Sequence, residues 1–232
     1  MCARPRRGLT RLPIKFISTG ARCGVTSVIA LWKRRLGKGF AVPYSSATAV
    51  LTAALIHTLR THLKQGGVIA YPTESCYGLG CDPRNRRAVM KILRLKGRPQ
   101  KKGMILVGAD FCQLKSYVAP LDAGQWQKIS PTWPGPVTWL LPASRKAQPW
   151  LRGRHSSLAV RVTAHPFAAH LCRVLGMALV STSANRSGLK SARTYAECSN
   201  SFGNRVLVLP GLIGKRRKPS AILDLATGTV IR

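Results

Sequence analysis

The chain has 232 residues, of which 38 are Lys or Arg and only 6 are Asp or Glu, so its formal net charge is +32. So few carboxylates argue against a metal site built wholly from protein ligands and against a paired-carboxylate acid–base mechanism, and no metal-binding residue is predicted. The cation excess favours a polyanionic partner such as RNA. A basic proteome or an adaptation for solubility would also account for it.

The 7 cysteines include no C-x-x-C pair, which fits reduced thiols in a cytoplasmic protein. No uncharged apolar run reaches the roughly 18 residues that a transmembrane helix needs, so no membrane span is predicted. The sequence also lacks the P-loop and G-x-G-x-x-G patterns. A nucleotide would therefore have to be held by Lys, Arg and small hydroxyl side chains from separate segments.

Residues 1–45 carry ten Lys or Arg, no acid and no amphipathic pattern. We expect a basic, disordered extension without a functional site. Two alternatives stay open here: an organellar transit peptide, which is also Arg-rich and poor in acids, or a start codon upstream of the physiological one. The folded domain is expected over residues 46–232.

The domain is predicted to open with a helix over residues 46–65, because leucines recur at every fourth position, at 51, 55, 59 and 63. The following stretch, 66–99, organises the rest of the chain. Its apolar run at 68–71 predicts a buried strand.

A polar segment with Gly78 and Gly80 follows this strand and predicts a loop. Asp82 and Pro83 then predict a helix start, a capping side chain before a proline at the first helical position. Gly97 predicts the end of that helix. A strand, a polar loop and a helix in this order suit an anionic ligand held near a strand end.

Strand and helix patterns alternate through the rest of the chain, which predicts an α/β sheet. The predicted strands are 104–107, 137–141, 157–162, 177–180, 206–209, 221–224 and 230–231, and the predicted helices are 111–114, 121–129, 165–175 and 192–198. A rigid turn is predicted at 133–136, where two prolines fix the backbone before a strand.

Five segments in order carry a family resemblance: PTESCYGLG with KGRP, WPGPVT, SLAVRVTAHP, STSANRSG and PSAILDLATGTVIR. Together they resemble the YrdC/TsaC family of threonylcarbamoyl-AMP synthases in its short bacterial form, over about residues 46–232. The likeness to a bacterial form argues against a transit peptide. It implies an α/β fold, a twisted mixed sheet with flanking helices and a large concave basic face.

The resemblance also implies an activity, that of a nucleotidyltransferase. L-threonine, bicarbonate or CO2, and ATP would give threonylcarbamoyl-adenylate and pyrophosphate, for the t6A37 modification of tRNA. Mg²⁺ would arrive bound to the triphosphate, and further proteins would transfer the threonylcarbamoyl group to tRNA. Such chemistry needs positioning and charge neutralisation more than a strong side-chain base.

Four residues match the family's K-x-R…S-x-N pattern and are the predicted catalytic set: Lys96, Arg98, Ser183 and Asn185. The two cations are assigned to the ATP phosphates, although both would also suit the negative C-terminal end of the preceding helix. Ser183 and Asn185 are assigned to phosphate or adenosine. Four further positions match ATP-binding ones in relatives: Lys102, Ser157, Ser220 and Arg232.

Arg161 matches the arginine that meets the carboxylate of threonine, where a planar guanidinium offers two parallel donors. A lone arginine in an apolar strand must in any case meet an anion or lie at the end of the sheet. Ser75 is assigned to threonine too, though many relatives have threonine there. Glu74 orders the loop, acts as a cap or forms a salt bridge.

One alternative from a different class stays open: a double-stranded-RNA-binding or ribosome-assembly module on the same fold, without catalysis. The charge of +32 would then be its active feature. The four matched catalytic positions favour the enzyme.

Overall fold

The structure is a computed structural model that describes residues 51–231. The predicted basic extension, residues 1–45, lies outside the described residues. So does Arg232, which was assigned to ATP.

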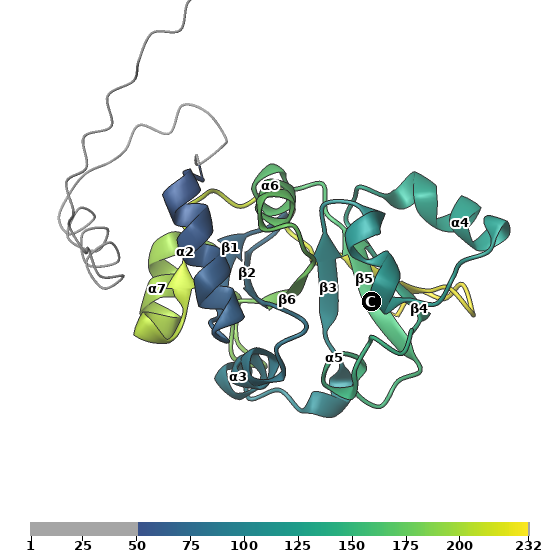
Figure 1. Cartoon of the computed structure of the whole chain (residues 1–232), viewed down its shortest axis with the longest axis horizontal. Helices are drawn as coiled ribbons and strands as arrows, with labels where there is room; N and C mark the ends of the chain where they lie inside the picture. The colour runs from purple at the N-terminus through teal and green to yellow at the C-terminus, as the bar shows by residue number, and fades with distance from the viewer. Residues whose placement is uncertain (1–50, 232) are drawn as a thin grey trace, which may run out of the picture. The chain divides into compact units, whose positions relative to one another are not determined.

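One eight-stranded sheet, in the order β7-β1-β2-β6-β3-β5-β4-β8, forms the centre of the fold (Figure 1). The strands are β1 (Ile69–Pro72), β2 (Tyr77–Cys81), β3 (Ile105–Gly108), β4 (Val137–Pro142), β5 (Ser157–Val162), β6 (Leu179–Ser183), β7 (Leu207–Val208) and β8 (Ala221–Asp224). The sheet is mixed, since β1 runs antiparallel to β2 whereas β3 runs parallel to β5. The predicted α/β class, a mixed sheet with flanking helices, is confirmed.

Helices cover both faces of the sheet and enclose two hydrophobic cores. They are α2 (Ala53–Lys64), α3 (Arg86–Lys96), α4 (Ala123–Ile129), α5 (Pro149–Arg152), α6 (Pro166–Leu175) and α7 (Tyr195–Phe202). Successive strand residues point to opposite faces. Ile69 and Tyr71 of β1 therefore join the core under α2 and α6, while Ala70 joins the larger core under α3 and α7.

The loop predicted after β1 is wrong in part, because Gly78 and Gly80 lie in β2. Tertiary packing explains these glycines. A Cβ at Gly80 would lie 2.7 Å from the ring of Tyr71, so only glycine lets the two strands pair around that buried side chain.

The predicted helix start at Asp82 and Pro83 is also wrong, since α3 begins at Arg86 with Asn85 as its cap. The Asn85 side chain accepts a hydrogen bond from the backbone N–H of Ala88. Asp82 instead forms an ion pair with Arg84. Both residues are good caps, and the chain uses the second.

Other element ends shift by a few residues. The first helix begins at Ala53 after the cap Thr52, and the part predicted over 46–50 lies outside the described residues. The predicted strand at 230–231 is a single bridge between Val230 and Leu223. Across residues 51–231, no helix is long and apolar enough to cross a membrane.

Candidate active site

A cavity of about 710 Å³ lies over one face of the sheet and gathers the predicted site residues. Nine of the ten line it, and the tenth, Arg232, lies outside the described residues: Ser75, Lys96, Arg98, Lys102, Ser157, Arg161, Ser183, Asn185 and Ser220. These positions span 146 residues of sequence, from 75 to 220, so the fold brings together what the motifs held apart. Their individual roles stay predictions.

Strand β5 shows how the sheet supplies the cavity floor. Ser157, Ala159 and Arg161 line the cavity, whereas Leu158, Val160 and Val162 belong to the larger core. The period of two along a strand explains this division. One arginine can therefore sit in an apolar strand without entering the core.

Lys96 ties the end of α3 to the segment after β6. Its side chain is buried, and Nζ donates to the carbonyl of Ser183 and to both the carbonyl and the Oδ1 of Asn185, the last two at 2.8 and 3.0 Å. Burial and the neighbouring Arg98 lower the pKa of the Lys96 ammonium to about 8. These three hydrogen bonds hold the Lys96 ammonium at the cavity wall.

The C-terminal end of α3 is closed by backbone groups and not by the Lys96 ammonium. Gly97 adopts a left-handed conformation, with φ of 59°, and its N–H bonds back into the last turn of α3. The N–H of Arg98 reaches the carbonyl of Leu93 at 3.0 Å. The alternative role considered for Lys96, as a cap for this helix, is therefore taken by Gly97.

Ser183 and Asn185 form a hydrogen-bonded unit beside Lys96. The Ser183 hydroxyl donates to Oδ1 of Asn185 at 2.6 Å. Nδ2 of Asn185 donates to the carbonyls of Leu189 at 2.7 Å and Arg186 at 2.9 Å. The amide is thus fixed on both sides, which makes this small-polar segment a preformed wall.

Arg98 holds the next turn of the chain in place. Its Nη2 donates to the carbonyls of Gly103 at 3.0 Å and Lys102 at 3.4 Å. The Lys102 side chain stays exposed at the cavity. Elsewhere in the cavity lining, the hydroxyl of Ser220 accepts a hydrogen bond from the Thr138 hydroxyl at 3.0 Å.

Arg161 meets an anion from the protein itself, since its Nη2 lies 3.2 Å from Oε2 of Glu74. The Thr163 hydroxyl donates to the other Glu74 oxygen at 2.7 Å. Burial alone would raise the pKa of Glu74, yet the Arg161 charge and the Thr163 hydroxyl bring it below its ordinary value. Of the readings left open for Glu74, the salt bridge is the one observed.

The Arg161 guanidinium is not fully satisfied by this pair. Its Nε is buried and has no hydrogen-bond partner in the described structure. Buried donors of this kind usually have a partner. The Nε donor of Arg161 is therefore left without an acceptor among the described residues.

A strap from Gly211 to Ser220 crosses beside the loop that carries Glu74. The N–H of Gly214 reaches the carbonyl of Thr73 at 2.9 Å, and the N–H of Arg216 reaches that of Glu74 at 3.1 Å. A Cβ at Gly214 would lie 2.6 Å from the Glu74 carbonyl, so the close approach requires glycine. The end of the strap then joins the cavity wall at Ser220.

Most of the chain matches the model of one protein family. The Sua5/YciO/YrdC model, described as "Telomere recombination", matches residues 61–232. The chain belongs to this family. The predicted YrdC resemblance is confirmed.

Two similar curated relatives share one name. A "Threonylcarbamoyl-AMP synthase" from Methylobacillus flagellatus is 59% identical over 174 residues, which are 75% of this chain and 97% of that protein. One of the same name from Chromobacterium violaceum is 58% identical over 75% of this chain and 90% of that protein.

Solved structures of the family share the fold. Escherichia coli YciO superposes with a TM-score of 0.69 at 27% identity, covering 78% of this chain and 89% of that one. P. abyssi Sua5 complexed with L-threonine has a TM-score of 0.69 at 28% identity, covering 75% of this chain. The chain spans about half of that Sua5, 51% of its length.

The Arg, His and Asp side chains that line the cavity of this family member without having been assigned to the site from the sequence are those of Arg152, His155 and Asp224. Arg152 is the last residue of the short helix α5, which was not among the predicted helices. Asp224 is the last residue of a predicted strand. Because the sequence has only 6 Asp and Glu residues, a carboxylate at the end of a strand was the signal that could have marked it as a site residue. No metal-binding group of three or more His, Cys, Asp or Glu occurs within residues 51–231.

Proposed function

We propose that the cavity makes threonylcarbamoyl-adenylate and pyrophosphate from L-threonine, bicarbonate or CO2, and ATP. This activity is inferred from the relatives named threonylcarbamoyl-AMP synthase, whose matches cover three quarters of the chain. The observation that supports this site is that one cavity holds both cations suited to phosphate, Arg98 and Lys102, and the buried Arg161, whose Nε has no hydrogen-bond partner in the described structure.

The nucleotide end lies between the end of α3 and the turn that follows. Arg98 and Lys102 neutralise phosphate charge from one wall, and Lys96 holds the Ser183–Asn185 segment against it. Mg²⁺ enters with the triphosphate as part of the substrate. Asp224 is the carboxylate that the cavity offers, in line with the one or two that Mg²⁺ usually takes beside phosphates.

The threonine end lies at β5. The free Nε of Arg161 supplies a donor for the threonine carboxylate, and Glu74 fixes the guanidinium from the other side. The Ser75 hydroxyl lines the same region of the loop before β2. L-threonine is the ligand in the related Sua5 complex, and we extend that ligand to this chain.

The reaction needs two bond-forming steps. The threonine amine attacks the carbon of CO2, an N–C bond forms and one proton leaves, which gives a carbamate. A carbamate oxygen then attacks the α-phosphorus of ATP, and the P–O bond to the β-phosphate breaks to release pyrophosphate. Residues of this cavity act by holding the two substrates in line and by neutralising charge, which are the main contributions to such transfers.

The test is threonine-dependent pyrophosphate release with labelled bicarbonate, compared between wild type, Arg98→Ala and Arg154→Ala. Losing one charge-assisted phosphate contact should cost about 2–3 kcal/mol, or roughly 30- to 150-fold in rate. Arg154 is exposed and does not line the cavity, so its variant serves as the matched control. Wild type without threonine-dependent release, or Arg98→Ala at full rate, would contradict the proposal.

Partners beyond the substrates are part of the same proposal. The threonylcarbamoyl group of the adenylate still has to be transferred to tRNA. We therefore propose that further proteins carry out this transfer and that RNA is a ligand of the basic surface. A cytoplasmic setting is supported by the free thiols of Cys76, Cys81, Cys112, Cys172 and Cys198.

A further inference from the structure

The outer face of α3 carries a row of cations. Arg87, Lys91 and Arg94 follow one another at spacings of four and three, which places them on one side of the helix. Arg86 precedes them in the first turn, about 100° around the helix from Arg87, and lines the groove at the start of α3 together with Arg87. The buried residues of α3, among them Val89 and Ile92, face the opposite way into the larger core. We call these four cations the α3 basic face.

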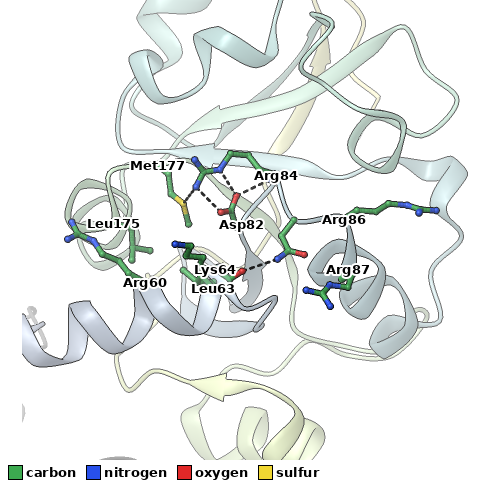
Figure 2. Close-up of a pocket in the computed structure, with 10 residues that line it drawn as sticks. Arg60, Leu63, Lys64, Asp82, Arg84, Arg86, Arg87, Leu175 and Met177 are labelled. Carbon is green, nitrogen blue, oxygen red and sulfur yellow. Dashed lines mark hydrogen bonds and ion pairs between the residues drawn. The ribbon is translucent and has the colours of Figure 1, made fainter. Parts of the chain in front are cut away.

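At the start of α3 this face opens into a groove of about 690 Å³ (Figure 2). Arg60 and Lys64 of α2 contribute further cations to its lining. Asp82 is the one carboxylate among the described lining residues, and Arg84 neutralises it through two hydrogen bonds of 3.0 and 2.8 Å. The groove therefore keeps a net positive charge without a protein anion to balance it.

The stability of α3 does not explain this charge. Like charges four or three positions apart destabilise a helix, and cations in the first turn oppose the helix dipole. The first turn holds no acid, and the ion pairs found within residues 51–231 do not involve the α3 basic face. Arg86 and Arg87 in the first turn oppose the helix dipole, whereas Arg94 lies in the last turn, where a cation is favourable. The row of Arg87, Lys91 and Arg94 still places like charges beside one another, so helix stability does not account for it.

We propose that the α3 basic face and its groove bind the phosphate backbone of a structured RNA. The proposed function favours RNA over other polyanions, because the product of the reaction serves tRNA modification. The choice of RNA as the ligand rests on the proposed function, whereas the cationic surface itself does not. Arg86, Arg87 and Arg94 are exposed and Lys91 is half-buried. Such a row of cations, without stacking aromatics, fits backbone contact and not base readout. α3 has 11 residues and a rise of about 1.5 Å for each, so Arg86, which lines the groove, and Lys96, which lines the cavity, lie at opposite ends of a helix about 15 Å long.

Two variants with the same net charge test the site. The first replaces Arg86, Arg87, Lys91 and Arg94 with Gln, which keeps helix propensity. The control replaces four exposed cations near α4 and after β4 with Gln: Lys115, Lys128, Arg145 and Lys146. Affinity for an unmodified tRNA transcript is measured by fluorescence anisotropy over a series of salt concentrations, with melting curves to check folding.

We expect the first variant to lose at least tenfold in affinity at about 0.1 M salt, with each lost contact lowering the salt slope by about 0.9. The control should lose less than threefold. A third variant, with Arg86, Arg87 and Arg94 all replaced by Lys, keeps the charge and should keep the wild-type slope. Adenylate formation should be unchanged in all three, because none of these residues lines the cavity.

Equal losses in the first variant and the control would overturn the proposal, since charge alone would then act without a site. So would a wild type that binds anionic lipid vesicles but not the transcript, or a first variant with wild-type affinity. Failure of adenylate formation in the wild type, with the RNA result as expected, would refute the proposed function and leave this surface in place.

Discussion

Replacing Glu74 with Gln tests the pair at the threonine end of the cavity. Gln keeps the size of the side chain and an acceptor for the Thr163 hydroxyl, but it removes the charge that lies 3.2 Å from Nη2 of Arg161. The Arg161 and Glu74 side chains are only 10% and 12% exposed, so the guanidinium would remain without a counter-charge in a poorly hydrated place.

Removing one partner of a buried pair costs about 3–5 kcal/mol, and the open cavity beside this pair favours the lower end. A domain of this size loses roughly 2–4 °C in melting temperature for each kcal/mol, so we expect a fall of about 6–12 °C at pH 7. Glu197→Gln, which changes an exposed carboxylate in the same way, should stay within about 1 kcal/mol.

The pH dependence gives a second readout. The pKa of Glu74 is lowered in the folded protein, so the pair stabilises the fold above the ordinary carboxyl pKa and loses its effect as the pH falls through the folded one. The gap between wild type and Glu74→Gln should therefore be full at neutral pH and close in acid. Saturating L-threonine should narrow the gap at pH 7, because its carboxylate would replace the missing charge on Arg161.

Differential scanning fluorimetry at several pH values, with and without threonine, measures all three effects. A variant that melts within a degree of the wild type at pH 7 would show that the pair is screened by solvent. A gap that persists unchanged into acid would show that the loss arises from something other than the Glu74 charge.

Three further predictions concern the substrates and the N-terminus. ATP should bind less tightly as the pH rises through about 8, because the buried Lys96 ammonium then loses its proton. Calorimetry should show an ATP affinity that does not change with pH for Lys96→Arg. A wild-type ATP affinity that does not change with pH would contradict the assignment of Lys96 to the ATP phosphates. Arg161→Lys should raise the KM for threonine about tenfold with little change for ATP, because lysine lacks the paired donors; steady-state kinetics showing a loss for ATP instead would place Arg161 at the nucleotide. Deleting residues 1–44 removes ten of the 38 cations but no residue of the family match, which begins at 61, so adenylate formation and melting temperature should not change; an inactive truncated protein would show that the catalytic domain begins earlier.

Strands with a clear period of two could be predicted from the sequence to the residue. β5, at Ser157–Val162, was expected over these bounds because polar and apolar positions alternate along it. β8, at Ala221–Asp224, was also predicted over its bounds, although its sequence, AILD, does not alternate. The β5 pattern is local, since that strand faces the cavity on one side and the core on the other.

Features that depend on distant partners could not be predicted in this way. Gly78 and Gly80 favour a loop by their composition, and only the ring of Tyr71 explains why a strand needs glycine at Gly80. The motifs brought Lys96 to the cavity, but two of its three acceptors are backbone carbonyls, which no residue identity reveals. Arg161 was expected to meet an anion, and the competition between a ligand and Glu74 could be judged only in three dimensions.

Both edges of the sheet are supplied by strands that follow the other six in sequence. β7 pairs with β1 at one edge and β8 pairs with β4 at the other, with the strap beside the cavity between them. While the chain is being synthesised, at about 5–20 residues per second, β1 and β4 therefore keep unpaired backbone groups after β1–β6 have emerged. A ribosome that stops before residue 205 would release a protein with two open edges and without the Ser220 wall, so premature termination yields an aggregation-prone species and not a partly active enzyme.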